Sequence, residues 1–160
     1  MSDRTLISSG SSFEALAGYS RAVVVGDDVL VSGTTGFDYT RMTIADDAVA
    51  QTHQCFANIA QALAQAGCTL DDVVRVQYLL TDAALFEPLA PIFGQYFRIA
   101  RPAATTSDSG GEVVRAASGL STMWRFATAM TGFILPAIQS SSSRALRSPV
   151  SYMSICGYSR

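Results

Sequence analysis

The sequence has no lysine, one histidine and few cysteines, and these shortages exclude several kinds of catalytic site. All eleven basic residues are arginines, so neither a Schiff-base lysine nor a phosphate-loop lysine is available. A protein zinc site needs three or four ligands, whereas the three cysteines are scattered and His53 lies alone in a helical pattern. We therefore expect no metal site.

Charge is also scarce, which argues against nucleic-acid and membrane partners. Charged residues make up 15% of the chain and the net charge is -2, so we expect no basic surface for nucleic acid. No signal peptide is evident, and Arg125 interrupts the most apolar later stretch, residues 120–138. Cys55 and Cys68 are typical of reduced, small apolar residues. The sequence thus predicts a cytoplasmic protein without a membrane span.

Among the features that are present, residues 19–38 carry the clearest strand signal. Valines occupy alternate positions on both sides of a possible turn: Val23, Val25, Val29 and Val31. This period of two predicts a hairpin, and Gly26 suits the first central position of a type II′ turn, which needs a positive φ. The small residues 32–36 that follow are either an ordinary strand exit or the wall of a ligand pocket.

The next segment predicts an amphipathic helix. Asp46 and Asp47 favour an N-cap, and Gly67 is typical of the position just after a helix end. Between them, residues of one face recur at steps of three and four: Val49, Thr52, Phe56, Ile59, Leu63 and Ala66. Such a helix needs a sheet or another helix to cover its apolar face.

A second strand and a second helix follow. In the strand, one face is expected to carry Val74, Val76, Tyr78 and Leu80. The helix is expected over residues 87–99. Because a proline is tolerated only in the first turn, Pro91 predicts that regular helix begins late in this range.

Together these elements predict one α+β domain. A short strand at residues 5–8 and a loop over residues 10–18, anchored by Phe13 and Leu16, precede the hairpin. The order strand, hairpin, helix, strand, helix predicts two helices packed on one face of a mixed β-sheet.

Five stretches also carry a family resemblance: Gly18-Tyr19-Ser20-Arg21-Ala22, residues 31–38, residues 54–67, residues 72–76 and Arg101-Pro102-Ala103-Ala104-Thr105. Together they resemble the RidA family (reactive intermediate deaminase A, also called YjgF) over residues 7–106. The resemblance implies a chorismate-mutase-like α+β fold and a homotrimer with a central barrel. It also implies small-molecule clefts between subunits and a reaction that needs no cofactor.

The resemblance further implies which residues line the cleft. Tyr19 matches the family tyrosine. The cleft loop of the family falls on Ser32, Gly33 and Thr34. The family's carboxylate-binding arginine falls on Ala104, and its nearby cysteine falls on Thr106.

Two catalytic candidates remain for imine hydrolysis. An arginine binds the substrate carboxylate bidentately, and a glutamate orients the attacking water. Arg101, just before the proline, and Glu112 are the residues left for these roles.

The resemblance stops after Thr106, so we divide the chain into a RidA-like domain, residues 1–106, and a Ser/Arg-rich segment, residues 107–160. Residues 112–116 and 123–133 are possible substitute strands. The segment is expected to be poorly ordered. Its origin is either a frame change in the coding sequence near Thr105 or natural divergence.

Two functions from different classes follow. The first is a small-molecule protein related to 2-imino acid deaminases, and if it is an enzyme it is a cofactor-free hydrolase. The second is a non-catalytic ligand-binding or regulatory trimer of the same fold. The alanine at position 104 favours the second where imino acids are concerned.

Overall fold

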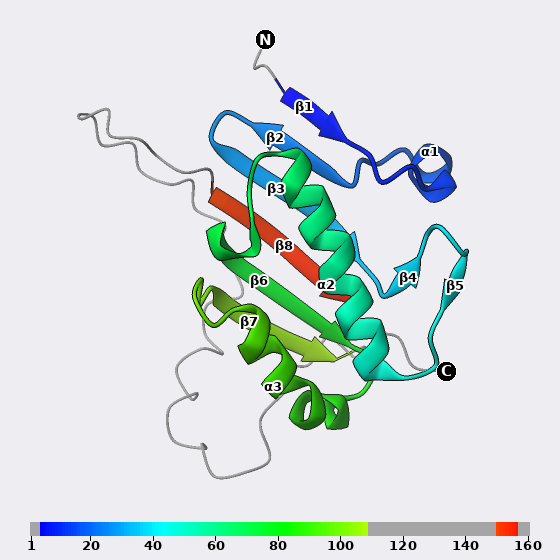
Figure 1. Ribbon diagram of the computed structural model, residues 1–160, viewed down its shortest axis with the longest axis vertical. Coiled ribbons are helices and arrows are strands. Elements are labelled where there is room, and N and C mark those ends of the chain that lie inside the picture. Colours follow the sequence, from blue (N-terminus) through cyan, green and yellow to red (C-terminus); the bar gives the residue numbers. More distant parts are fainter. Residues whose placement is uncertain (1–3, 109–149, 157–160) are drawn as a thin grey trace, which may run out of the picture.

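A mixed sheet carries the fold in the computed structural model, which describes residues 4–108 and 150–156 (Figure 1). Its six strands are β1 (Arg4–Ile7), β2 (Ala22–Val25), β3 (Asp28–Thr34), β6 (Val73–Leu80), β7 (Ala103–Asp108) and β8 (Val150–Cys156). Their order across the sheet is β1-β2-β3-β8-β6-β7. The pairs β1–β2 and β2–β3 are antiparallel, and the pairs from β3 to β7 are parallel.

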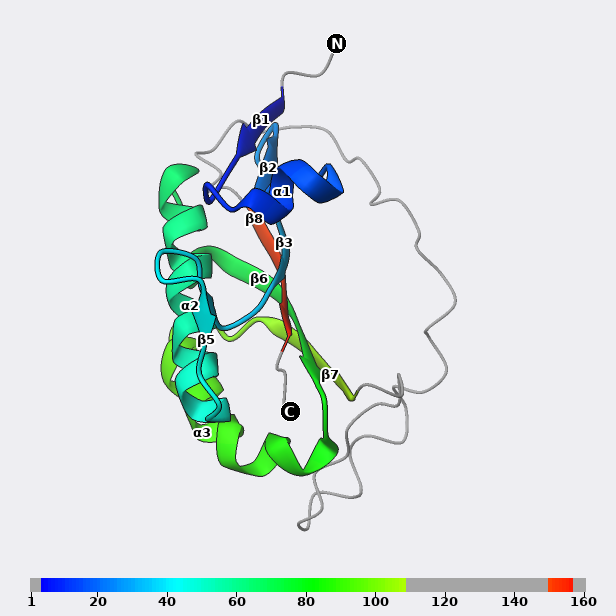
Figure 2. The same ribbon diagram turned by 90° about the vertical axis from the view of Figure 1, so that its right-hand side faces the viewer.

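The helices lie mainly on one side of this sheet. They are α1 (Ser12–Ala17), α2 (Ala48–Gln65) and α3 (Phe86–Tyr96), with single 3-10 turns η1 (Leu70–Asp72) and η2 (Ala83–Leu85). Figure 2 shows α2 and α3 side by side over one face. A two-stranded ladder, β4 (Phe37–Asp38) and β5 (Thr43–Ile44), lies beside α2. The predicted α+β class, with two helices on one face of a mixed sheet, is confirmed.

The hairpin and the first long helix follow their predicted local chemistry. Gly26 has a φ of +59° and Val25 pairs with Asp28 across the two-residue turn. The Asp47 carboxylate accepts a hydrogen bond of 2.7 Å from the Ala50 amide and caps α2. Gly67 has a φ of +75° just beyond the helix end. Both predictions are confirmed.

The predicted apolar face of α2 holds except at its start. Phe56, Ile59 and Leu63 are fully buried in the core. Val49, however, is exposed, whereas Gln51 and Thr52, which follow it in α2, are buried.

The prediction of a loop over residues 10–18 is wrong, because this segment contains α1. The Ser11 hydroxyl caps the helix by accepting a hydrogen bond from the Phe13 amide, and Gly18 ends it in the left-handed conformation. Leu16 is 85% exposed and is not an anchor. Phe13 packs edge to face against Phe37.

The two faces predicted for β6 hold except at the first two residues of the strand, where they are exchanged. Val76, Tyr78 and Leu80 are buried as expected, but Val73 is buried and Val74 is exposed. The register against β8 shifts between Val73 and Arg75. A bulge inserts one residue and exchanges the two faces before it, which the sequence pattern does not reveal.

The predicted late start of the second helix is also wrong. α3 begins at Phe86, directly after η2, and contains Pro91 in its interior. Pro91 is exposed, while Leu89, Ile92 and Phe93 on the opposite face are buried. Burial of this face outweighs the lost backbone hydrogen bond, which is how tertiary packing overrides local preference.

Strand β8 lies between β3 and β6 and pairs with both in parallel. The sequence analysis assigned no strand to this segment. The substitute strands proposed at residues 112–116 and 123–133 lie outside the described residues. None of the described helices has the length and apolar character required to cross a membrane.

The loop between β3 and α2 is fastened tightly to that helix. The side-chain amide of Asn58 donates hydrogen bonds to the backbone carbonyl oxygens of Thr35 and Phe37, at 3.1 and 2.9 Å. Gly36 is buried against the backbone of Gln51. A Cβ atom at position 36 would overlap the Gln51 carbonyl oxygen and Cα, so only glycine fits here.

We therefore expect Gly36→Ala to destabilise the protein by about 1–3 kcal/mol, the usual cost of overpacking a rigid contact. Thermal unfolding measures this change. The matched control is Gly94→Ala in the exposed face of α3, where nothing lies within 4 Å. That variant should be neutral or more stable by about 0.5–1 kcal/mol, because alanine favours helix. Equal stability of Gly36→Ala and the wild type would contradict the close contact.

Candidate functional site

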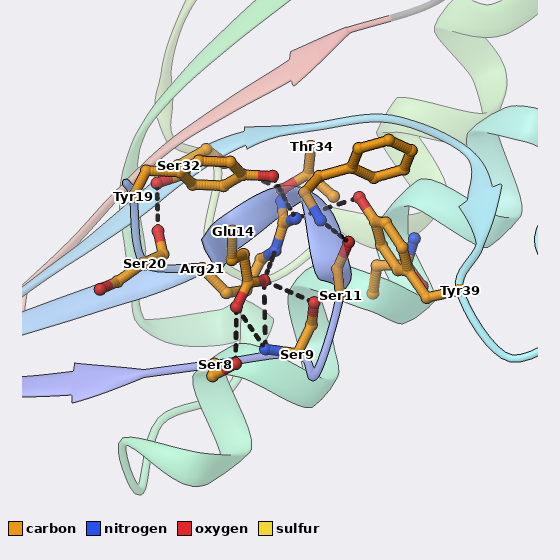
Figure 3. Close-up of polar contacts among 12 residues, drawn as sticks. Ser8, Ser9, Ser11, Glu14, Tyr19, Ser20, Arg21, Ser32, Thr34 and Tyr39 are labelled. Atoms are coloured by element: carbon orange, nitrogen blue, oxygen red, sulfur yellow. Dashed lines mark hydrogen bonds and ion pairs between the residues drawn. The ribbon is translucent and has the colours of Figure 1, made fainter. Parts of the chain in front are cut away.

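A buried arginine organises the polar residues where α1, β2 and β3 meet (Figure 3). Arg21 is 1% exposed. Its guanidinium contacts four other side chains, and we call these five residues the Arg21 cluster: Glu14, Tyr19, Arg21, Thr34 and Tyr39. A buried charge needs such partners, since an unpaired ion in the interior is costly.

The two terminal nitrogens of Arg21 have different partners. Nη1 donates to the Gly33 carbonyl and to the Thr34 hydroxyl, both at 3.2 Å. Nη2 donates to the phenol oxygens of Tyr19 and Tyr39, at 3.3 and 3.0 Å. The guanidinium carbon lies 5.6 Å from the Tyr19 ring centroid and 5.2 Å from that of Tyr39, which is within cation–π range.

Glu14 balances the charge of Arg21. Its Oε1 lies 3.4 Å from Nε of Arg21, and both side chains are almost fully buried. Within the described residues this Nε makes no hydrogen bond, so the contact is an ion pair. The carboxylate also accepts bonds from the hydroxyls of Ser8 and Ser9, at 2.6 and 2.5 Å, and from the Ser9 amide at 3.2 Å. Helix α1 therefore presents a well-held anion to Arg21.

The pKa of Glu14 reflects these contacts. Burial raises the pKa of the carboxyl group. The hydrogen bonds from Ser8 and Ser9, together with the positive charge of Arg21, outweigh burial and hold the pKa below its ordinary value of 4.5. Glu14 is consequently ionised at neutral pH.

The hydroxyls of Ser32 and Thr34, near the end of β3, are used inside the fold. Ser32 donates to the Ser20 carbonyl at 2.6 Å, and Thr34 donates to the Ser32 carbonyl at 2.8 Å. Gly33 is exposed and its carbonyl accepts from Arg21. These contacts fix the end of β3 against the start of β2 and leave the two tyrosines as the outer members of the cluster.

The structure brings only some of the predicted ligand-binding residues together. Tyr19, Ser32, Gly33 and Thr34 gather around Arg21, whereas Ala104 and Thr106 lie on β7. Across the sheet, Ala104 pairs with Val76 of β6, and the same register continues through β8 to Val31 of β3. Three strand spacings, about 14 Å, therefore separate Ala104 from Val31. One small ligand cannot span both groups within a single chain.

The catalytic candidates lie apart from the Arg21 cluster or outside the described residues. Arg101 is exposed in the turn between α3 and β7, with a φ of +45°. Its amide donates to the Phe97 carbonyl at 3.0 Å and closes the end of α3. Glu112 lies outside the described residues.

Arg75 is the arginine on the strand beside β7, and its side chain lies on the opposite face of the sheet from Ala104. It pairs with Ala103, whereas Ala104 pairs with Val76, whose side chain is buried under the helices. Since neighbouring residues of a strand point to opposite faces, Arg75 and Ala104 lie on opposite faces. Arg75 also donates to the Ala103 carbonyl at 3.0 Å and to the Thr105 hydroxyl at 2.7 Å.

Sequence reasoning missed the residues that hold this site together. Arg21 belongs to one of the stretches that resemble the family, but no sequence pattern singles out Glu14 or Tyr39. The available signal was a single arginine directly before an otherwise apolar strand, with few acids near it in sequence. The described residues contain no group of three or more His, Cys, Asp or Glu that could hold a metal ion.

We expect Glu14→Gln to lower stability at neutral pH by about 1–3 kcal/mol, because it weakens hydrogen bonds to a charged group. The folded-state pKa of Glu14 is lowered, so its contribution is present above the unfolded-state pKa and is lost as the pH falls through the folded-state value. Thermal unfolding from pH 7 to pH 3 should therefore show the difference between wild type and variant shrink below about pH 4.5.

The exposed Glu87 of α3 provides the control. Glu87→Gln should change stability by less than about 0.5 kcal/mol at neutral pH, as is usual for surface substitutions. A gap between wild type and Glu14→Gln that stays constant from pH 7 to pH 3 would contradict the assigned role of the carboxylate.

Known proteins resemble this chain in sequence and in fold. The Endoribonuclease L-PSP family matches residues 9–110. The 2-iminobutanoate/2-iminopropanoate deaminases of Bos taurus and Homo sapiens are each 33% identical to this chain over 101 residues, covering 62% of this chain and 74% of theirs.

Solved structures agree with this match. A crystal structure from Mycobacterium tuberculosis, of a member of the YjgF/YER057c/UK114 family, has a TM-score of 0.60 and 39% identity, covering 72% of this chain and 89% of that one. RidA from an Antarctic Psychrobacter has a TM-score of 0.53 and 32% identity, covering 64% and 78%. The chain, matched over residues 9–110, therefore belongs to the Endoribonuclease L-PSP family, which is the RidA/YjgF family.

Proposed function

We propose that this chain holds a small molecule in clefts between the subunits of a homotrimer, and that it hydrolyses 2-imino acids little faster than water alone does. The observation that carries the proposal is Ala104. It occupies the position of the family's carboxylate-binding arginine and has no hydrogen-bond donor in its side chain. The ligand class, the homotrimer and the role of position 104 are taken from the family resemblance.

The separation of the two half-sites supports a cleft between subunits. Tyr19 and Gly33 lie at one side of the sheet, and Ala104 and Thr106 lie on β7 at the other edge. A second copy that placed its β7 beside the first copy's Tyr19 would bring the halves within reach of one ligand. Symmetric association also covers sheet edges, which are otherwise prone to pairing with other chains.

The chemistry of imine hydrolysis explains why Ala104 matters. Water adds to the C=N carbon, and loss of ammonia leaves a 2-oxo acid, so the protein must hold the carboxylate and position the water. An arginine would supply charge-assisted, paired hydrogen bonds to the carboxylate, each worth about 1.5–3 kcal/mol. Arg75 lies on the wrong face and Arg101 lies in the exposed turn before β7.

A non-catalytic binding or regulatory role on the same trimer is the second candidate. It is favoured by the same observation, because loss of the arginine removes substrate positioning without removing the Arg21 cluster. Measured turnover distinguishes the two candidates. The cytoplasmic location expected from the sequence stays a prediction.

For the reaction, we expect the purified protein to clear enzymatically generated 2-iminopropanoate at a rate close to the spontaneous rate. Ala104→Arg should bind pyruvate, the product, about tenfold more tightly, which corresponds to one charge-assisted contact. It should not restore turnover, because an arginine at position 104 holds the carboxylate but does not orient the attacking water. Ala103→Arg, on the opposite face of the same strand, is the matched control and should change neither quantity. Clearance far above background by the wild type would overturn the proposal for Ala104.

For the assembly, we expect the protein to sediment as a trimer at micromolar concentration. Analytical ultracentrifugation of the full chain measures this state. A single monomeric species over the same concentration range would count against the cleft between subunits, whatever the result of the hydrolysis assay.

A further inference from the structure

We propose that Arg21 is a positioning residue that fixes the hydroxyls of Tyr19 and Tyr39 as a pair of hydrogen-bond donors for an oxygen acceptor of the ligand. The inference rests on the proposed function and deepens it by naming the ligand chemistry. In this proposal, the Arg21 cluster donates the hydrogen bonds to a ligand oxygen for which the Ala104 side chain has no donor.

The direction of the hydrogen bonds follows from the chemistry of the guanidinium. Arginine carries donors and no acceptor. In its contacts with Tyr19 and Tyr39, at 3.3 and 3.0 Å, the phenol oxygens must therefore accept. Each phenol has a single proton, which then points away from Arg21. Both hydroxyls share one nitrogen, Nη2, so they lie close to each other and act as donors outward.

The position of Arg21 is held on its other sides. Nη1 is occupied by the Gly33 carbonyl and the Thr34 hydroxyl, and Nε faces the Glu14 carboxylate. The guanidinium is thus unable to turn toward a ligand, and with 1% exposure it does not meet solvent. Tyr19 is 37% exposed and Tyr39 is half-buried. The two phenols are the part of the cluster that a ligand can reach.

A pair of fixed donors selects ligands by their acceptors. A carbonyl or carboxylate oxygen, as in a 2-oxo acid, would accept from one or both phenols. A ligand that presents only N–H groups would leave the phenol protons unpaired, and a site built for one hydrogen-bonding partner rejects analogues that lack it. The ligand class is therefore a small molecule with a carboxylate or carbonyl edge.

The test compares two variants that break the same ion pair. Glu14→Gln removes the charge of Glu14 but leaves Arg21 and its contacts with the phenols. Adding Arg21→Met to Glu14→Gln removes those contacts and leaves no unpaired buried charge, which protects folding. Pyruvate binding is measured by NMR titration of the full chain, well below the unfolding temperature of each variant.

We expect Glu14→Gln, which keeps the contacts of Arg21 with the phenols, to weaken pyruvate binding by at most about threefold, half of the free-energy loss of the double variant. The double variant should bind pyruvate about tenfold more weakly, the size of one lost hydrogen bond to a charged ligand. A purely structural role predicts instead that both variants lose affinity together, in proportion to their loss of stability. That result would overturn the inference.

The tyrosines give an independent measurement. Tyr19→Phe with Tyr39→Phe removes only the phenol oxygens and should also weaken pyruvate binding about tenfold. Adding Glu14→Gln and Arg21→Met to this pair should cause no further loss, because Arg21 acts through the hydroxyls. Additive losses, or unchanged binding in the double phenylalanine variant, would overturn the inference. So would a wild type that does not bind pyruvate, while the trimer and hydrolysis measurements would still decide the proposed function.

Discussion

The sheet depends on the hydrogen bonds of one strand, β8, which joins two halves that do not touch each other as strands. On one side lie β1, β2 and β3, and on the other lie β6 and β7. β3 and β6 each pair with β8 in parallel and not with each other. Helix α2 links the halves through side-chain packing. Among the described strands, the continuous backbone ladder between the halves runs only through β8, the last of them in sequence. Parallel pairing between segments this far apart in sequence is expected to form late in folding, because the entropy cost of bringing them together comes before the gain from their hydrogen bonds.

The polar cluster obeys a second constraint, the cost of burying charge. An arginine in the interior is tolerated only when its charge and its donors are matched. Here α1 supplies the carboxylate, the end of β3 supplies a carbonyl and a hydroxyl, and the turn of the β4–β5 ladder supplies Tyr39. The close contact of Gly36 with α2 sets the path of the chain between Thr34 and that ladder. The fold and the site are therefore linked through the same short loop.

The sequence predicted those features that depend on neighbours along the chain. The hairpin at Gly26 and the cap at Asp47 are decided by local φ angles and hydrogen bonds, and both were predicted correctly. The bulge at Val73, the early start of α3 and the strand β8 depend on pairing or burial against distant segments, and no local pattern reveals them. For the site, the resemblance pointed to Tyr19 and the loop of Gly33. It did not point to the partnership of Arg21 with Glu14, because that pair is made only when α1 folds onto the hairpin.

The placement of Ala104 and of the Arg21 cluster at separate sides of the sheet has an evolutionary consequence. Residues that share no contacts accept substitutions independently, since their energetic effects add. A change at position 104 therefore leaves Arg21, Glu14 and the two tyrosines undisturbed, and a change in that cluster leaves β7 undisturbed. For the proposed cleft, this division lets a lineage exchange one half of the binding site while it retains the other. Ligand preference can then drift by single substitutions without passing through an unfolded intermediate.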